Sequence, residues 1–198
     1  MNGASPVFPE ELQAADDVEI TLDTGRTVAL HRYRVDFNAC NERLLIALDK
    51  AYSARPLVLV EKQPAFPEIA LLGLFVKSGW QGAWVDLPHR KFFDKMPNIS
   101  KGISLSTHAN QVVSRVTEAN GQSRAGLWDL ILWQDRTVVF IRVVGRDADP
   151  SDDAAHARWL AAGLRAGLSA SQFVVVQWGW RTVAAKKKPR PPLTSPRG

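Results

Sequence analysis

Two long apolar segments joined by a two-residue turn most constrain the fold of this chain. The segments "GLWDLILW" (126–133) and "RTVVFIRVVG" (136–145) are rich in aliphatic and aromatic residues, which favours buried strands, with Gln134-Asp135 as the turn. A helical pattern follows in "DPSDDAAHARWLAAGLRAG" (149–167), and "SQFVVVQW" (171–178) reads as another strand. Buried strands that alternate with helices are typical of an α/β domain.

A helix and a strand precede these segments. "PEIALLGLFVKSG" (67–79) predicts a helix with Pro67 at its start and Gly79 at its end, and "GAWVDLP" (82–88) predicts a short strand. For the later helix, we expect Asp149 to be the N-terminal cap. The predicted order is therefore helix, three strands, helix and strand.

We interpret residues 1–62 as an N-terminal extension of this core. After a leader of residues 1–16, "VEITLDTGRTVALHRYRV" (18–35) alternates in polarity on both sides of a turn and predicts a β-hairpin. "NERLLIALDKAYS" (41–53) predicts a short helix, and "RPLVLVEKQP" (55–64) predicts a strand or an extended linker.

The remaining chain divides into a core at residues 63–180 and a tail at residues 181–198. The core contains an insertion at about 88–124, in which "THANQVVSRVTEAN" (107–120) predicts one helix. The tail is rich in lysine and proline and is predicted to be disordered. Its cations account for the formal net charge of +5, so the rest of the chain is close to neutral.

Composition excludes several classes of protein. Cys40 is the only cysteine, which excludes an internal disulfide and a cysteine-based zinc cluster. The four histidines are far apart in sequence and show no ligand-like pairing. No segment approaches membrane-spanning length, and the N-terminus lacks the pattern of a signal peptide. We expect a soluble cytoplasmic protein without a membrane partner.

The element order, with "GLWDLILW" followed by "VVFIRVVG" and "HARWLAAGLRAG", resembles the PD-(D/E)XK nuclease superfamily, and within it the VRR-NUC group. The resemblance covers roughly residues 66–178. It implies a restriction-endonuclease-like core in which an aspartate and a carboxylate on the next strand hold Mg²⁺ or Mn²⁺. In such enzymes a lysine two residues further activates water, and a glutamate of the first helix assists.

The residues that match these positions depart from the pattern at its centre. Glu68 matches the first-helix glutamate and Asp129 the metal-binding aspartate, so these two would be the metal ligands of an active enzyme. Arg142 stands at the position of the second carboxylate, and Val144 stands at the position of the lysine. His156 replaces a glutamine that VRR-NUC members carry in the second helix.

The arginine decides how this site is interpreted. A guanidinium group has only hydrogen-bond donors and a permanent positive charge, so Arg142 repels a cation instead of binding it. Alternation along a strand places Arg142 on the same face as residue 144 and directs it toward Asp129. We predict an ion pair between Arg142 and Asp129, with Glu68 as a further partner, in the space of a lost metal ion.

Two alternatives stay open. In the first, a carboxylate or lysine from elsewhere completes a rearranged metal site, with Lys77, Asp86, Asp147 and Asp149 as candidates. In the second, Asp129 is an ordinary polar residue in an unrelated α/β fold.

Basic residues suggest where nucleic acid would bind. "LPHRKFFDKMP" (87–97) mixes cations with two phenylalanines, a combination that suits phosphate and base contacts, but the favoured interpretation is a solvated loop anchored by two core phenylalanines. The lysines of the tail suit salt-sensitive contact with phosphates, or only solubility. The candidate nucleic-acid-binding residues are Arg90, Lys91, Arg158, Arg165, Lys186, Lys187 and Lys188.

These features indicate a degenerate VRR-NUC-like protein that is catalytically inactive, needs no cofactor and binds nucleic acid, with DNA favoured over RNA. One alternative is an active nuclease that uses Mg²⁺ or Mn²⁺ and rearranged catalytic residues. The other is a protein-interaction module on the same scaffold, for instance in a homodimer.

Overall fold

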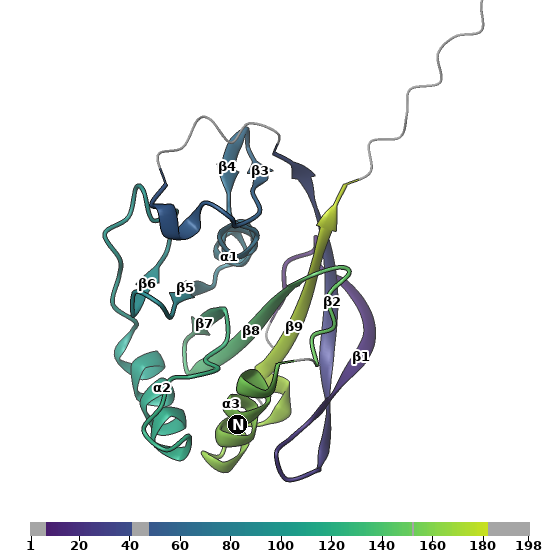
Figure 1. Ribbon diagram of the computed structural model, residues 1–198, viewed down its shortest axis with the longest axis vertical. Helices are drawn as coiled ribbons and strands as arrows, with labels where there is room; N and C mark the ends of the chain where they lie inside the picture. Colours follow the sequence, from purple (N-terminus) through teal and green to yellow (C-terminus); the bar gives the residue numbers. More distant parts are fainter. Residues whose placement is uncertain (1–6, 41–47, 152, 182–198) are drawn as a thin grey trace, which may run out of the picture.

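The computed structural model describes residues 7–40, 48–151 and 153–181, and it shows a mixed α/β fold (Figure 1). The strands form a single nine-stranded sheet in the order β4-β3-β2-β9-β8-β7-β5-β6, with β1 paired to β2. The strands are β1 (Gln13–Thr21), β2 (Thr27–Ala39), β3 (Val58–Val60), β4 (Gln63–Ala65), β5 (Gln81–Asp86), β6 (Lys91–Phe93), β7 (Leu130–Gln134), β8 (Thr137–Gly145) and β9 (Phe173–Trp180).

In the described residues, three α-helices cover the two faces of this sheet: α1 (Pro67–Lys77), α2 (Thr107–Ala119) and α3 (Ala154–Arg165). Side chains of α1 pack into one hydrophobic cluster with Trp84 and Ile141, whereas those of α2 and α3 pack into a second cluster with Phe140 and Phe173. The structure is therefore a three-layer arrangement with one helix on one face and two on the other. No helix in the described part of the chain is long and apolar enough to cross a membrane.

The predicted series of helix, three strands, helix and strand is present as α1, β5, β7, β8, α3 and β9. The strands β5, β7 and β8 pair antiparallel, and β8 pairs parallel to β9. A parallel pair needs a crossover connection, and α3 supplies it. The helix at 67–79 begins at Pro67, as predicted, and Gly79 follows its end with a left-handed φ of 87°.

The N-terminal hairpin is present as β1 and β2, and β2 also pairs parallel with β9. The extension therefore adds strands to the core sheet. The leader predicted for residues 1–16 is too long, because β1 already begins at Gln13. The segment 55–64 forms most of a second small hairpin, β3 and β4.

Some predicted elements lie partly or wholly outside the described residues. A helix was predicted at 41–53, but residues 41–47 lie outside the described residues. The described part of this segment contains a short 3₁₀ turn at Lys50–Tyr52. The tail from residue 182 onward also lies outside the described residues.

The predicted cap of the 149–167 helix is wrong. The helix begins at Ala154, and Asp153 is the cap, since its carboxylate accepts hydrogen bonds from the backbone N–H groups of Ala155 and His156. Asp149 instead accepts hydrogen bonds from the backbone and side chain of Ser151, which makes a local turn ahead of the helix.

The strand predicted at 126–133 begins only at Leu130, because the preceding residues pack against the start of α3. Gly126 has a left-handed φ of 80°, and the Trp128 indole N–H donates a hydrogen bond of 3.3 Å to the His156 carbonyl. A Cβ atom on Gly126 would lie 1.9 Å from the Ala155 carbonyl oxygen. This contact fixes Asp129 next to the first turn of α3.

Replacement of Gly126 by alanine tests this contact. We expect Gly126→Ala to lower the free energy of unfolding by about 3 kcal/mol, because the new methyl group overlaps backbone atoms and strains φ. Gly121→Ala is the matched control, since Gly121 also has a left-handed φ but open space around it, and it should cost about 1 kcal/mol. Urea denaturation measures both variants. Equal decreases in the free energy of unfolding for Gly126→Ala and Gly121→Ala would contradict the close packing of Gly126 on α3.

Candidate functional site

The predicted ion pair between Arg142 and Asp129 is present. Asp129 directly precedes β7, and Arg142 lies opposite it on β8, since the neighbouring residues Leu130 and Ile141 are paired. The Arg142 Nη1 atom donates a hydrogen bond of 2.6 Å to Asp129 Oδ2, and the Val143 backbone N–H donates one of 2.8 Å to the same oxygen. Both side chains of the pair are about 20% exposed. The pair therefore joins the start of β7 to the middle of β8 in a half-buried position.

Glu68 has a different partner from the one predicted. It lies in the first turn of α1, where it is buried, and its carboxylate pairs with the guanidinium of Arg55. The Arg55 Cζ atom also lies 5.2 Å from the centre of the Phe66 ring and 5.0 Å from that of Trp84. Arg55 is therefore held from three sides. The prediction that Glu68 shares Arg142 is wrong because Arg55 takes that role.

The electrostatics of Glu68 reflect both burial and its neighbours. Burial raises the pKa of Glu68, and the charge of Arg55 opposes this rise. The nearby charge of Asp129 adds to the rise in the pKa of Glu68, so the two carboxylates are close enough to interact. Each of the two expected metal ligands is thus neutralised by its own arginine.

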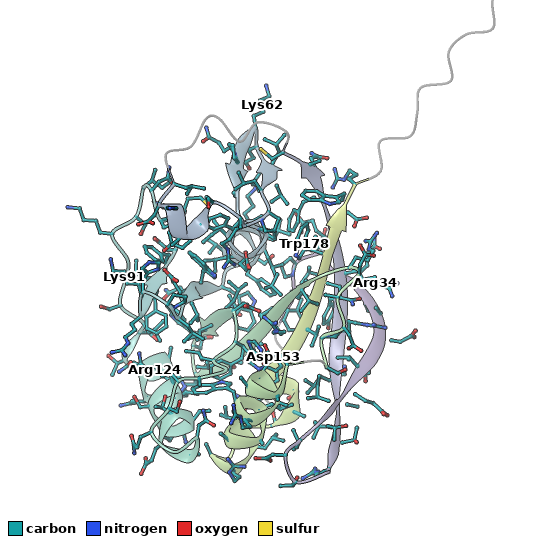
Figure 2. All side chains as sticks on the ribbon, viewed as in Figure 1. Arg34, Lys62, Lys91, Arg124, Asp153 and Trp178 are labelled. Atoms are coloured by element: carbon teal, nitrogen blue, oxygen red, sulfur yellow. The ribbon has the colours of Figure 1, made fainter. Side chains whose placement is uncertain are left out.

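The start of α3 completes the surroundings of Arg142. Asp153, labelled in Figure 2, has its Oδ2 atom 4.0 Å from Arg142 Nη2 and 2.6 Å from His156 Nδ1. Burial lowers the pKa of His156, and the positive charge of Arg142 lowers it further, although Asp129 and Asp153 oppose this shift. Arg142 consequently lies between two carboxylates, those of Asp129 and Asp153.

These residues do not suit Mg²⁺ or Mn²⁺. Hard divalent cations need several converging oxygen ligands, whereas Asp129 Oδ2 pairs with the guanidinium of Arg142 and Glu68 Oε1 pairs with that of Arg55. The second carboxylate oxygen of Glu68, Oε2, is buried and has no hydrogen-bond partner. Val144, at the lysine position, is only 6% exposed and packs in the hydrophobic cluster beneath α2 and α3. Within the described residues, no group of three or more His, Cys, Asp and Glu side chains is arranged to hold a metal ion.

The four residues considered for a rearranged site are placed elsewhere. Lys77 pairs with Glu61 at 2.6 Å on the exposed end of α1, and Asp149 serves the turn before α3. Asp147 lines a surface hollow beside Trp178 and Trp180. None of these three residues makes a hydrogen bond or ion pair with Asp129 or Glu68.

Asp86, the fourth of these residues, belongs to a separate polar cluster. Its Oδ2 atom accepts a hydrogen bond of 2.5 Å from the Tyr52 hydroxyl and lies 2.7 Å from His89 Nδ1. Burial raises the pKa of Tyr52, and the hydrogen bond with Asp86 raises it further. The buried carboxylate of Asp86 is therefore satisfied by these two side chains.

The candidate nucleic-acid-binding residues fall into separate groups. Arg90 and Lys91 line a cavity at the edge of the sheet, together with Arg124. Arg158 is exposed on α3, and Arg165 donates a hydrogen bond to the Ala119 carbonyl at the end of α2. Lys186, Lys187 and Lys188 lie outside the described residues.

Several residues of the site were not predicted from the sequence. Arg55 precedes a short strand and carries no motif, and Arg124 follows a helix without a recognisable pattern. Trp180 is another such residue, with 44% of its surface exposed. Its position at the last residue of β9, where the sheet ends, is the signal that would have indicated exposure.

Comparisons with protein-family models, with curated proteins and with solved structures found no match to this chain. Its function is therefore inferred from the residues that the fold brings together.

A double-mutant cycle measures the strength of the central pair. We expect Arg142→Gln and Asp129→Asn to show a coupling free energy of about 2 kcal/mol in urea denaturation, because both groups are mostly shielded from water. The pair of Arg146 and Asp36 is the control, since its side chains are 45% and 39% exposed, and its coupling should stay below about 1 kcal/mol. Equal coupling in the two cycles would contradict a special role for the Arg142–Asp129 pair.

Proposed function

We propose that this chain binds nucleic acid on a scaffold similar to the PD-(D/E)XK nucleases, with the VRR-NUC group as the nearest resemblance, and that it does not cleave its ligand with a metal ion. The observation that carries the proposal is the pairing of both expected metal ligands with arginines, Asp129 with Arg142 and Glu68 with Arg55. Metal-dependent hydrolysis needs those oxygens for a cation that polarises phosphate and activates water.

The arrangement of elements supports the choice of scaffold. The order α1, β5, β7, β8, α3 and β9 is the order that the resemblance implies. Glu68 lies in its first helix, Asp129 directly precedes its second strand and Arg142 lies in its third strand. The influence of Asp129 on the pKa of Glu68 also supports a common site for these residues.

The end of β9 supports nucleic acid as the ligand. Trp178 and Trp180 lie edge to face with their ring centres 5.0 Å apart, and Trp180 is exposed (Figure 2 labels Trp178). The basic tail follows directly in the sequence, with Lys186, Lys187 and Lys188 at its centre. An exposed aromatic ring that is followed in the sequence by several cations suits a single strand, because bases stack on the ring while phosphates pair with the cations.

Binding and cleavage are tested on single-stranded DNA, duplex DNA and RNA in the presence of Mg²⁺ or Mn²⁺. We expect wild type to bind, with DNA preferred, and to leave the strands intact. Replacement of Lys186, Lys187 and Lys188 by glutamine should reduce the slope of log affinity against log salt by about 2, because three phosphate contacts are lost. Fluorescence anisotropy at several salt concentrations measures this slope.

The control removes the same charge elsewhere, with Arg26, Lys50 and Lys62 replaced by glutamine, and should leave the slope nearly unchanged. Cleavage by wild type that Asp129→Ala abolishes would show an active nuclease and overturn the proposal. Absence of nucleic-acid binding in wild type would also overturn it, in favour of a protein-interaction module.

A further inference from the structure

A cavity of about 640 Å³ lies at the edge of the sheet, away from the Arg142–Asp129 pair. Its walls come from the ends of β5 and α2, from β6, and from the loop that leads toward β7. Figure 2 labels Lys91 and Arg124 on this side of the molecule, beside β6 and above α2. The volume is within the range of pockets that hold a small organic ligand.

Three cations line this cavity: Arg90, Lys91 and Arg124. In the described part of the chain, none of them forms an ion pair with a carboxylate. Asp86 is the one acidic residue of the lining, and its buried carboxylate is engaged by Tyr52 and His89. Unpaired cations that line a hollow raise the positive potential there, which favours an anionic ligand.

The backbone on both sides of the cavity is ordered by local hydrogen bonds. Arg90 has a left-handed φ of 55° at the turn between β5 and β6, and its N–H donates a hydrogen bond to the Leu87 carbonyl. On the opposite wall, the Asn120 side-chain amide donates hydrogen bonds to the carbonyls of Ser123 and Ala125 on both sides of Arg124. Because both turns are already ordered, a ligand would not need to order the backbone on which these cations stand, and the cost of ordering is that of their exposed side chains.

The cavity also offers a planar surface. The Arg124 Cζ atom lies 5.9 Å from the centre of the Phe92 ring, and both residues line the cavity. Nucleobases stack on aromatic rings and on guanidinium planes, so this pair suits a flat heterocycle. Gln122 adds a polar side chain to the lining, which suits the hydroxyl groups of a sugar, whereas the hydroxyls of Thr117 and Ser123 are already bonded to Val113 and Ala125.

We propose that this cavity binds a free nucleoside monophosphate, with its phosphate among Arg90, Lys91 and Arg124 and its base against Phe92 and Arg124. The proposal goes beyond the proposed function, because it concerns a small ligand and does not use the Arg142–Asp129 pair or the tail. A phosphomonoester carries up to two negative charges, which matches a lining with three cations.

Isothermal titration of the full chain with the adenine, guanine, cytosine and uracil monophosphates tests this proposal. We expect at least one nucleotide to bind with one-to-one stoichiometry and at least about tenfold more tightly than its nucleoside or inorganic phosphate, because each of these lacks one half of the contacts. Arg124→Gln should weaken binding about tenfold or more. Arg115→Gln, an exposed change on α2 outside this cavity, should leave it unchanged.

Three results would overturn the proposal. The first is that no monophosphate binds, and the second is that Arg124→Gln and Arg115→Gln weaken binding equally. The third is that only a 5′-phosphorylated single strand binds, since the ligand would then be a strand end and not a free nucleotide. Strand binding by an Arg124→Gln variant that has lost the nucleotide would support two separate sites.

Discussion

The hydrogen-bonded pair of Arg142 and Asp129 is the interaction on which the centre of this structure depends. Asp129 accepts hydrogen bonds from the Arg142 side chain and from the Val143 backbone, so one carboxylate oxygen joins the loop before β7 to β8. Arg142 also faces Asp153, the residue that caps α3. The pair thereby connects two strands and the helix that crosses from β8 to β9.

The same interaction determines which chemistry the site supports. A metal ion and a guanidinium both neutralise carboxylates, but only the metal ion lowers the pKa of a bound water and accepts a phosphate oxygen. Arg55 pairs with Glu68 in the same way, and it comes from a part of the chain outside the strands and helices of the core. Each of the two carboxylates has its own arginine partner. This favours a site held together by ion pairs over a metal site that lacks one of its ligands.

Much of the fold could be predicted from periodicity, whereas the surroundings of the site could not. The apolar runs of β7, β8 and β9 and the signals at Pro67 and Gly79 were sufficient for the order of elements. The pair of Arg142 and Asp129 followed from strand alternation. Arg55 could not be predicted, because its contact with Glu68 depends on how an irregular segment packs on α1. The three-residue strand β6 was missed because three residues show no periodicity.

Binding of Mn²⁺ tests the central claim most directly. Titration of wild type, followed by electron paramagnetic resonance, should show no saturable site up to millimolar concentration, because both carboxylates are engaged by arginines. The double variant Arg55→Gln and Arg142→Gln should gain a site, since it frees those oxygens and removes two positive charges. Stoichiometric binding by wild type that Asp129→Asn abolishes would contradict the claim that the arginines have replaced the metal.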